Sequence, residues 1–306
     1  YSVGTPFQRS AVEDMSFDVY DGEFLGIIGH TGSGKSTLIQ HLNGLLRPTS
    51  GQILLHGKDI WAEPKKIRDV RFQVGLVFQY PEYQLFEETV YKDIAFGPIN
   101  QGKTEEELDR CVREAARLVG IRDDQLDKSP FELSGGMARR ALIAAAVAER
   151  PKLIIADEPT TALDVTIQAQ ILDLLRNLKD KINSSIMLIT HDLGVIAEMA
   201  DYVVVMYAGR VVEKGTAQEI FANPAHPYTI GLMASKPMVG KKVDKLYSIP
   251  GKVPNPINMP NYCYFKDRCE MCVDGCQGEY PHMIQLSPTH MVSCYRYYGK
   301  EDAQNG

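Results

Sequence analysis

Residues 29–37 constrain this chain of 306 residues most strongly, because they read Gly-His-Thr-Gly-Ser-Gly-Lys-Ser-Thr, a G-x-x-x-x-G-K-S phosphate-binding pattern. The apolar run at 24–28 predicts a buried strand before the loop, and residues from 38 onward predict a helix after it. Strand, Gly-rich loop and helix is the context in which this pattern binds nucleotide phosphates. The sequence therefore predicts an α/β fold that carries a nucleotide site.

Each part of the loop has an expected task. The glycines let backbone N–H groups turn toward a phosphate, and the following helix N-terminus adds partial positive charge. We expect Lys35 to reach the β- and γ-phosphates and the Ser36 hydroxyl to bind Mg²⁺. The expected contacts with ATP come from the whole loop: Gly29, His30, Thr31, Gly32, Ser33, Gly34, Lys35, Ser36 and Thr37.

Charge and hydropathy exclude other classes. The chain has 33 Lys and Arg against 39 Asp and Glu, a net charge of -6, which gives no electrostatic case for binding nucleic acid. No apolar stretch approaches the roughly 20 residues that span a bilayer, and no signal peptide is recognisable. We therefore expect a cytosolic protein.

A second group of polar residues follows predicted strands. Residues 153–156 form an apolar run that ends at Asp157 and Glu158. Asp157 is expected to hold Mg²⁺, and Glu158 to orient or deprotonate the attacking water. His191 and Gln79 also end strands, and phosphates bind at the carboxyl ends of parallel strands. We expect His191 to contact the γ-phosphate, and Gln79 to bind Mg²⁺ or the attacking water.

A second anion-binding helix start is predicted at Leu-Ser-Gly-Gly, residues 133–136, through Ser134, Gly135 and Gly136. It belongs to a predicted helical insertion at about 85–150, which carries it away from the first loop of the same chain. Within this insertion Thr104 opens a helix through a capping box, and Cys111 falls at an apolar position of that helix. We interpret Cys111 as a small buried apolar residue.

The order and approximate spacing of these motifs resemble the ATP-binding subunits of ABC transporters, over residues 1 to about 222. The resemblance implies a P-loop ABC ATPase fold, with a mostly parallel sheet, an antiparallel edge and the helical insertion. It also implies a head-to-tail dimer, homomeric or heteromeric, with each ATP between Lys35 of one subunit and Ser134 of the other. Asp164 belongs to a further motif at that site, and Tyr1 matches the aromatic residue that stacks on adenine.

The resemblance points to two branches of the family. Residues 1–121 are similar to ATPases of energy-coupling-factor importers for vitamins and metals, whereas residues 152–306 are similar to ATPases of oligopeptide and dipeptide permeases. Our interpretation is a peptide importer on the cytoplasmic face of the membrane, with transmembrane permease subunits and an external substrate-binding protein. The alternatives are an energy-coupling-factor importer, or a soluble ABC-type ATPase of iron–sulfur assembly without a membrane partner.

Proline and cysteine mark the end of the chain. We expect an ATPase domain at 1–223 and a small Pro- and Cys-rich module at 224–306. In the peptide branch four cysteines of this module bind a 4Fe–4S cluster, which is the expectation here, with zinc and unliganded thiols or disulfides as the alternatives. The matching positions are Cys263, Cys269, Cys276 and Cys294, and Cys272 is extra to the pattern.

Overall fold

The computed structural model describes residues 10–235, 247–254 and 259–299, and the chain divides into two compact units. The first unit comprises Tyr1–Asp18, Leu25–Leu38 and His191–Gly306, and the second comprises Val19–Phe24 and Ile39–Thr190. The expected adenine-stacking residue, Tyr1, lies outside the described residues. Among the described residues, no helix combines the length and the apolar character needed to cross a membrane.

Three parallel strands form the sheet of the second unit. They pair in the order β4 (Val74–Val77), β5 (Leu153–Asp157) and β6 (Ser185–Ile189), with Val77 opposite Ala156 and Asp157 opposite Ile189. Their residues are almost all buried, as expected for parallel strands that are covered on both faces. Helix α7 (Val165–Ile182) supplies part of this core through buried leucines and isoleucines.

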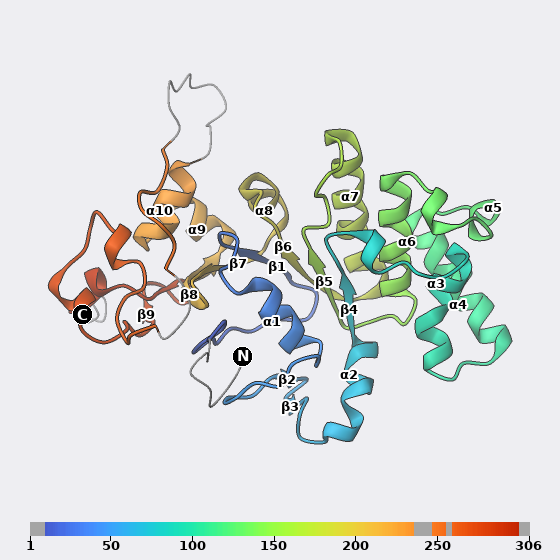
Figure 1. Cartoon of the computed structure of the whole chain (residues 1–306), viewed down its shortest axis with the longest axis horizontal. Coiled ribbons are helices and arrows are strands. Elements are labelled where there is room, and N and C mark those ends of the chain that lie inside the picture. Colours follow the sequence, from blue (N-terminus) through green and yellow to red (C-terminus); the bar gives the residue numbers. More distant parts are fainter. Residues whose placement is uncertain (1–9, 236–246, 255–258, 300–306) are drawn as a thin grey trace. The chain divides into compact units, whose positions relative to one another are not determined.

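The same unit contains a group of packed helices. In Figure 1 they run from cyan to green, and α3 (Val90–Asn100), α4 (Glu105–Val119) and α6 (Gly135–Val147) pack on one another. Helix α4 begins with the predicted capping box of Thr104. Cys111 differs from the expectation, because it is only half-buried and its Sγ accepts a hydrogen bond from Lys103 at 3.1 Å. The shorter elements are α2 (Ile67–Gln73), α5 (Asp123–Leu126) and the strands β2 (Leu54–Leu55) and β3 (Lys58–Asp59).

The first unit has a mixed sheet that includes the end of the chain. Strand β1 (Phe24–Ile28) enters this unit at Leu25 and pairs in parallel with β7 (Tyr202–Tyr207). The order then continues antiparallel through β8 (Arg210–Thr216), β10 (Met291–Val292) and β9 (Ile284–Gln285). The helices of this unit are α8 (Leu193–Met199), α9 (Ala217–Ala222) and α10 (Pro227–Ala234), together with the first turn of α1 (Lys35–Leu42).

The mixture of parallel strands, antiparallel edge and helices confirms the predicted α/β architecture. A separate Cys-rich appendage is not confirmed. Strands β9 and β10 of the tail continue the sheet beyond β8, so their backbone groups pair with the first unit. The sequence contains only weak strand signals there, because each strand has two residues. The boundary expected near residue 224 stays a prediction.

Candidate functional site

The predicted phosphate loop lies between β1 and α1 in the first unit. Its glycines have the backbone conformations that the pattern requires: φ is +82° at Gly32 and +97° at Gly34. A Cβ atom at Gly34 would also lie 2.5 Å from the carbonyl oxygen of Ala11. Any larger residue at Gly34 would therefore be strained and would collide with backbone.

The ammonium group of Lys35 is held by the loop itself. It donates to the carbonyl oxygens of Gly29 at 2.7 Å and His30 at 2.9 Å, and to Ser33 Oγ at 3.3 Å. The carbonyl oxygen of Ser33 in turn accepts a hydrogen bond from the N–H of Gly209, after β7. An entering phosphate would thus meet a cation whose position is already set. Ser36, the expected Mg²⁺ ligand, is exposed on the first turn of α1.

In the second unit, β5 ends in the predicted carboxylates. Asp157 is its last residue, and Glu158 follows with φ +47°, a left-handed conformation that is costly for a residue with a side chain. The N–H of Glu158 bonds to the carbonyl of Ile189 at 2.8 Å. Its Oε2 accepts hydrogen bonds from the hydroxyls of Thr161 and Thr190, at 3.3 and 3.4 Å. The Glu158 carboxylate is therefore held from two segments of the chain.

Arg139 in α6 is a residue that sequence reasoning missed. Its side chain is 2% exposed, and it donates to the carbonyl oxygens of Phe78 at 2.8 Å and Gln79 at 2.7 Å. A longer bond of 3.5 Å reaches the carbonyl of Thr161. One guanidinium thus joins the end of β4, helix α6 and the turn after Glu158. The sequence offered only a weak signal, because Arg139 is followed by Arg140 and only the structure shows which of the two is buried.

The second predicted anion-binding helix start is also well formed. Ser134 caps α6, its Oγ accepting from the N–H of Met137 at 3.4 Å, and Asp164 caps α7 through the N–H of Ile167 at 2.9 Å. A Cβ at Gly136 would lie 2.8 Å from Ile167 Cγ2, so the two helix starts pack closely. Ser134 and Asp164 are both exposed in this chain.

The division into units separates the predicted residues into two sets. The phosphate loop and His191 belong to the first unit, and His191 is exposed just before α8. The second set consists of Gln79, Ser134, Gly135, Gly136, Asp157, Glu158 and Asp164. The roles of the individual residues in both sets stay predictions.

The second unit also contains a cavity of about 270 Å³ between β4, α3 and α6. Phe86 and Phe96 lie on its rim, 60% and 47% exposed, with their rings edge to face at 5.0 Å. Glu149 lines it, and burial raises the pKa of this carboxyl to about 7. Burial also raises the pKa of Asp93, whose Oδ1 accepts from two backbone N–H groups. The cavity is therefore lined by apolar residues together with two acidic groups and one guanidinium, that of Arg71.

The cysteines of the tail influence one another electrostatically. The N–H of Cys263 donates to the carbonyl of Cys276 at 3.3 Å, and Cys263 experiences the charges of Cys276, Cys294 and Cys269. Burial is the main cause that raises the pKa of the Cys263 thiol to about 12. Among the residues that the structure describes, Nη1 of Arg296 is buried without a hydrogen-bond partner, and the charge of Arg296 acts on the Cys294 thiol.

This arrangement does not confirm a metal centre. Within residues 10–235, 247–254 and 259–299, no three or more His, Cys, Asp or Glu side chains are grouped so that they could hold a metal ion. The electrostatic proximity of the thiols is a weaker criterion, since charges interact over distances longer than a metal–ligand bond. Thiolates are the ligands that an iron–sulfur cluster takes, but the described part of the chain does not contain the expected grouping.

Comparison with known families identifies two regions of the chain. The model of the ABC transporter family matches residues 12–161. The model of the oligopeptide/dipeptide transporter C-terminal region matches residues 212–276. The first match contains the phosphate loop, the Ser134 motif and both carboxylates, whereas the second begins within β8 and contains four of the five tail cysteines.

Curated relatives point mainly to one branch. The chain is 51% identical to the energy-coupling factor transporter ATP-binding protein EcfA2 of Caldanaerobacter subterraneus subsp. tengcongensis, over 76% of this chain and 81% of the relative. It is 48% identical to the protein of the same name from Ligilactobacillus salivarius, over 73% and 78%.

Solved structures have the same architecture. The cbiO1 protein of Clostridium perfringens, described as part of the ABC transporter complex cbiONQ, matches with a TM-score of 0.65 and 38% identity, over 70% of this chain and 84% of that one. A dimer of the ATP-binding cassette MJ0796 bound to ADP and Pi matches with a TM-score of 0.61 and 26% identity, over 68% and 90%.

Proposed function

The chain belongs to the ATP-binding subunits of ABC transporters, and within this family we propose that it powers an energy-coupling-factor importer. As a member it is an ATPase that couples ATP hydrolysis to transport through a membrane importer, and its site is built for ATP and Mg²⁺. The observation that carries the finer proposal is the 51% identity to an energy-coupling factor subunit over most of both chains.

We propose the individual roles as follows. Lys35 and the loop N–H groups bind the phosphates, Ser36 and Asp157 hold Mg²⁺ with Gln79, and Glu158 activates water. His191 contacts the γ-phosphate. Ser134, Gly135, Gly136 and Asp164 serve the nucleotide of a second subunit, in a homodimer or heterodimer. Three observations support these roles. The Lys35 ammonium is hydrogen-bonded to the loop, the Glu158 carboxylate accepts from two threonine hydroxyls, and Ser134 is exposed at the start of α6.

One observation supports the alternative that the chain powers a peptide importer, namely the match of residues 212–276 to the oligopeptide/dipeptide transporter C-terminal region. We give it less weight, because the resemblance to the family implies that residues 79–100 dock the membrane partner. These residues lie in the second unit, whereas the peptide-type match lies in the first. The names of the relatives give no support to an external substrate-binding protein. We propose a peripheral position on the cytoplasmic face of the membrane, since the partner subunits lie in the membrane.

We propose that the cavity of the second unit docks a helix of the transmembrane partner. The exposed rings of Phe86 and Phe96 offer an apolar surface of the kind that an amphipathic helix covers. Glu149 and Asp93 add acidic groups inside the cavity, and a buried carboxylate is stabilised by a cation. The expected occupant is therefore a short helix with apolar residues and one Arg or Lys.

Two complexes decide between the branches. The chain would be co-expressed with the transmembrane subunit of the Caldanaerobacter energy-coupling factor transporter and, separately, with the membrane subunits of a dipeptide permease. We expect retention of the first during purification, and stimulation of its ATPase activity, but not of the second. Retention of only the dipeptide permease would reject the proposed branch, and retention of neither would support the iron–sulfur assembly alternative.

Glu149→Gln should weaken retention of the coupling-factor subunit about tenfold, because a desolvated ion pair loses one partner. Since the pKa of Glu149 is raised to about 7, its carboxyl is protonated below that value. Retention by the unmodified chain should therefore fall as the pH drops from 8 to 6, and Glu149→Gln should remove this dependence. The matched control is Glu106→Gln on the exposed face of α4. Equal retention by Glu149→Gln and the control would reject the docking role.

The cysteine tail is proposed to hold the iron–sulfur cluster that the peptide-type resemblance implies. A cation stabilises thiolate ligands, and the charge of Arg296 acts on the Cys294 thiol. After anaerobic purification we expect about four irons and four sulfides per chain, and Cys276→Ser should lose both. About one zinc per chain would assign a tetrahedral zinc site, and chains without metal would leave reduced thiols.

A further inference from the structure

A hydrogen bond joins the phosphate loop to the peptide-type part of the chain. The N–H of His30, the second residue of the loop, donates to the hydroxyl oxygen of Tyr228 at 2.9 Å. Tyr228 is the second residue of α10 and is only 1% exposed. The contact connects residues 198 positions apart in sequence, and both belong to the first unit.

The hydrogen bond to Tyr228 restrains the Gly29–His30 peptide group, whose carbonyl oxygen accepts from Lys35. The N–H of His30 and the carbonyl of Gly29 are the two ends of one planar unit, so fixing the direction of one fixes the other. The Gly29 carbonyl accepts from the Lys35 ammonium at 2.7 Å. Tyr228 therefore restrains the orientation of the carbonyl that positions the cation expected to meet the phosphates.

Aromatic packing in turn restrains the Tyr228 ring. Its centroid lies 4.7 Å from that of Tyr207 and 5.6 Å from that of Phe265. Arg268 donates to the Tyr207 hydroxyl at 3.2 Å and to the carbonyl of Pro250 at 2.8 Å. Phe265 and Arg268 both lie between Cys263 and Cys269, so the ring is held by the cysteine tail.

A buried acidic residue anchors the start of α10. Glu213 of β8 is fully buried and accepts from the N–H groups of Ala225 at 2.7 Å and His226 at 2.9 Å, and from His290 Nε2 at 2.7 Å. Burial lowers the pKa of His226 to about 4, so its neutral Nδ1 accepts from the N–H of Tyr228 at 3.0 Å.

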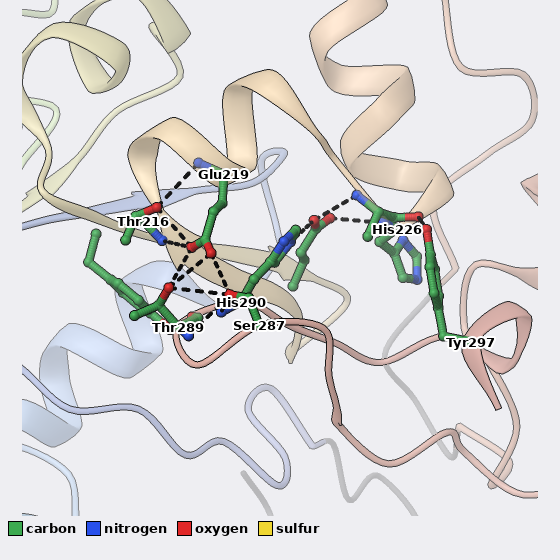
Figure 2. A network of polar contacts seen from close by, with 10 residues as sticks. Thr216, Glu219, His226, Ser287, Thr289, His290 and Tyr297 are labelled. Atoms are coloured by element: carbon green, nitrogen blue, oxygen red, sulfur yellow. Dashed lines mark hydrogen bonds and ion pairs between the residues drawn. The ribbon is translucent and has the colours of Figure 1, made fainter. Parts of the chain in front are cut away.

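His290 brings the tail to this anchor through its contact with Glu213. Figure 2 shows His290 beside Thr289 and Ser287. Ser287 and Thr289 also hydrogen-bond to the Glu219 carboxylate in α9. The tail is thus tied by polar contacts to β8 and α9, the elements that precede α10.

We propose that Tyr228 is a positioning residue for ATP, through which the C-terminal tail sets the affinity of the phosphate loop. Without the Tyr228 hydroxyl, the Gly29–His30 peptide can turn, and the Gly29 carbonyl no longer restrains Lys35, which keeps its bonds to His30 and Ser33. The inference rests on the proposed role of the loop in binding phosphate. Burial raises the pKa of the Tyr228 hydroxyl above its usual value, so the group stays neutral at working pH.

The test is Tyr228→Phe in the full chain, with the Kd for ATP measured by calorimetry without Mg²⁺, and KM and kcat measured with Mg²⁺. We expect Kd and KM to rise about fivefold to tenfold, the range of one neutral hydrogen bond, while kcat stays within about twofold because Glu158 is untouched. The matched control is Tyr91→Phe in α3 of the second unit, which removes a hydroxyl that donates to Asp109 Oδ1 at 3.3 Å. Its Kd should be unchanged.

Lys35→Ala distinguishes a failure of the proposed phosphate-binding role of the loop from a failure of the positioning role of Tyr228. If Lys35→Ala keeps full affinity for ATP, the proposed role of the loop fails. If Lys35→Ala loses affinity but Tyr228→Phe does not, the loop stands and the positioning role of Tyr228 fails. Equal changes in Tyr228→Phe and Tyr91→Phe, with lower thermal midpoints for both, would reduce Tyr228 to a structural role and overturn the inference.

Discussion

Glu158→Gln is expected to lower the rate of ATP hydrolysis at least about a hundredfold, the lower range for loss of a general base, with ATP binding within about twofold of the original. The amide has the shape of the carboxylate but cannot accept the proton of the attacking water. The hydroxyls of Thr161 and Thr190 can still donate to the amide oxygen, so the local geometry should persist. Lys35 and the loop remain intact, and nucleotide binding depends on them.

The measurement pairs steady-state phosphate release with ATP binding by calorimetry on the same preparation. Glu132→Gln is the control, because Glu132 is an exposed carboxylate shortly before Ser134 and outside the proposed catalytic set. It should hydrolyse ATP at the original rate. Near-normal phosphate release by Glu158→Gln would remove Glu158 from the role of the base and leave Asp157 or a water network as the activating group.

Ser134→Arg is expected to abolish hydrolysis by a homodimer, because the added guanidinium fills the exposed start of α6 that is proposed to face the partner's nucleotide. Binding of ATP to the loop of the same chain should be much less affected. In a head-to-tail dimer every site combines the loop of one chain with Ser134 of the other. Ser134→Arg and Lys35→Ala each inactivate both sites of their own homodimers.

Mixing the two variants provides the decisive result. A mixed dimer has one site with both defects and one site with neither, so an equal mixture should recover about a quarter of the original activity if pairing is random and the sites act independently. The control is a chain with both substitutions mixed with Ser134→Arg, in which no intact site can form. Absence of recovery in the first mixture would show that a single composite site does not work alone.

Local patterns predicted the elements that carry the site. The loop 29–37, the strand before it and the helix after it are encoded by neighbouring residues, as are the capping box at Thr104 and the cap at Asp164. The apolar run before Asp157 and Glu158 predicted β5 almost to the residue. These features depend on backbone conformation and hydrophobic pattern within about ten residues, which a single sequence displays directly.

The branch of the family could not be read in this way. The two ends of the chain favoured different importers, and the interpretation given first, a peptide importer, receives less support from the relatives than the energy-coupling-factor alternative. A long appended tail is conspicuous in sequence, but the residues expected to meet the membrane partner occupy a different unit.

The sequence by itself determined that this protein binds and hydrolyses ATP, because the phosphate loop and the strand that ends in Asp157 and Glu158 are each formed by neighbouring residues. Only the tertiary structure decided that Arg139 joins β4 to α6, and that Tyr228 holds the loop through His30. It also decided that the tail adds strands to the first unit. These contacts join residues 60 or more positions apart. Such pairs form only when the chain folds and buries these residues together, and a local sequence pattern does not show which distant residues will meet.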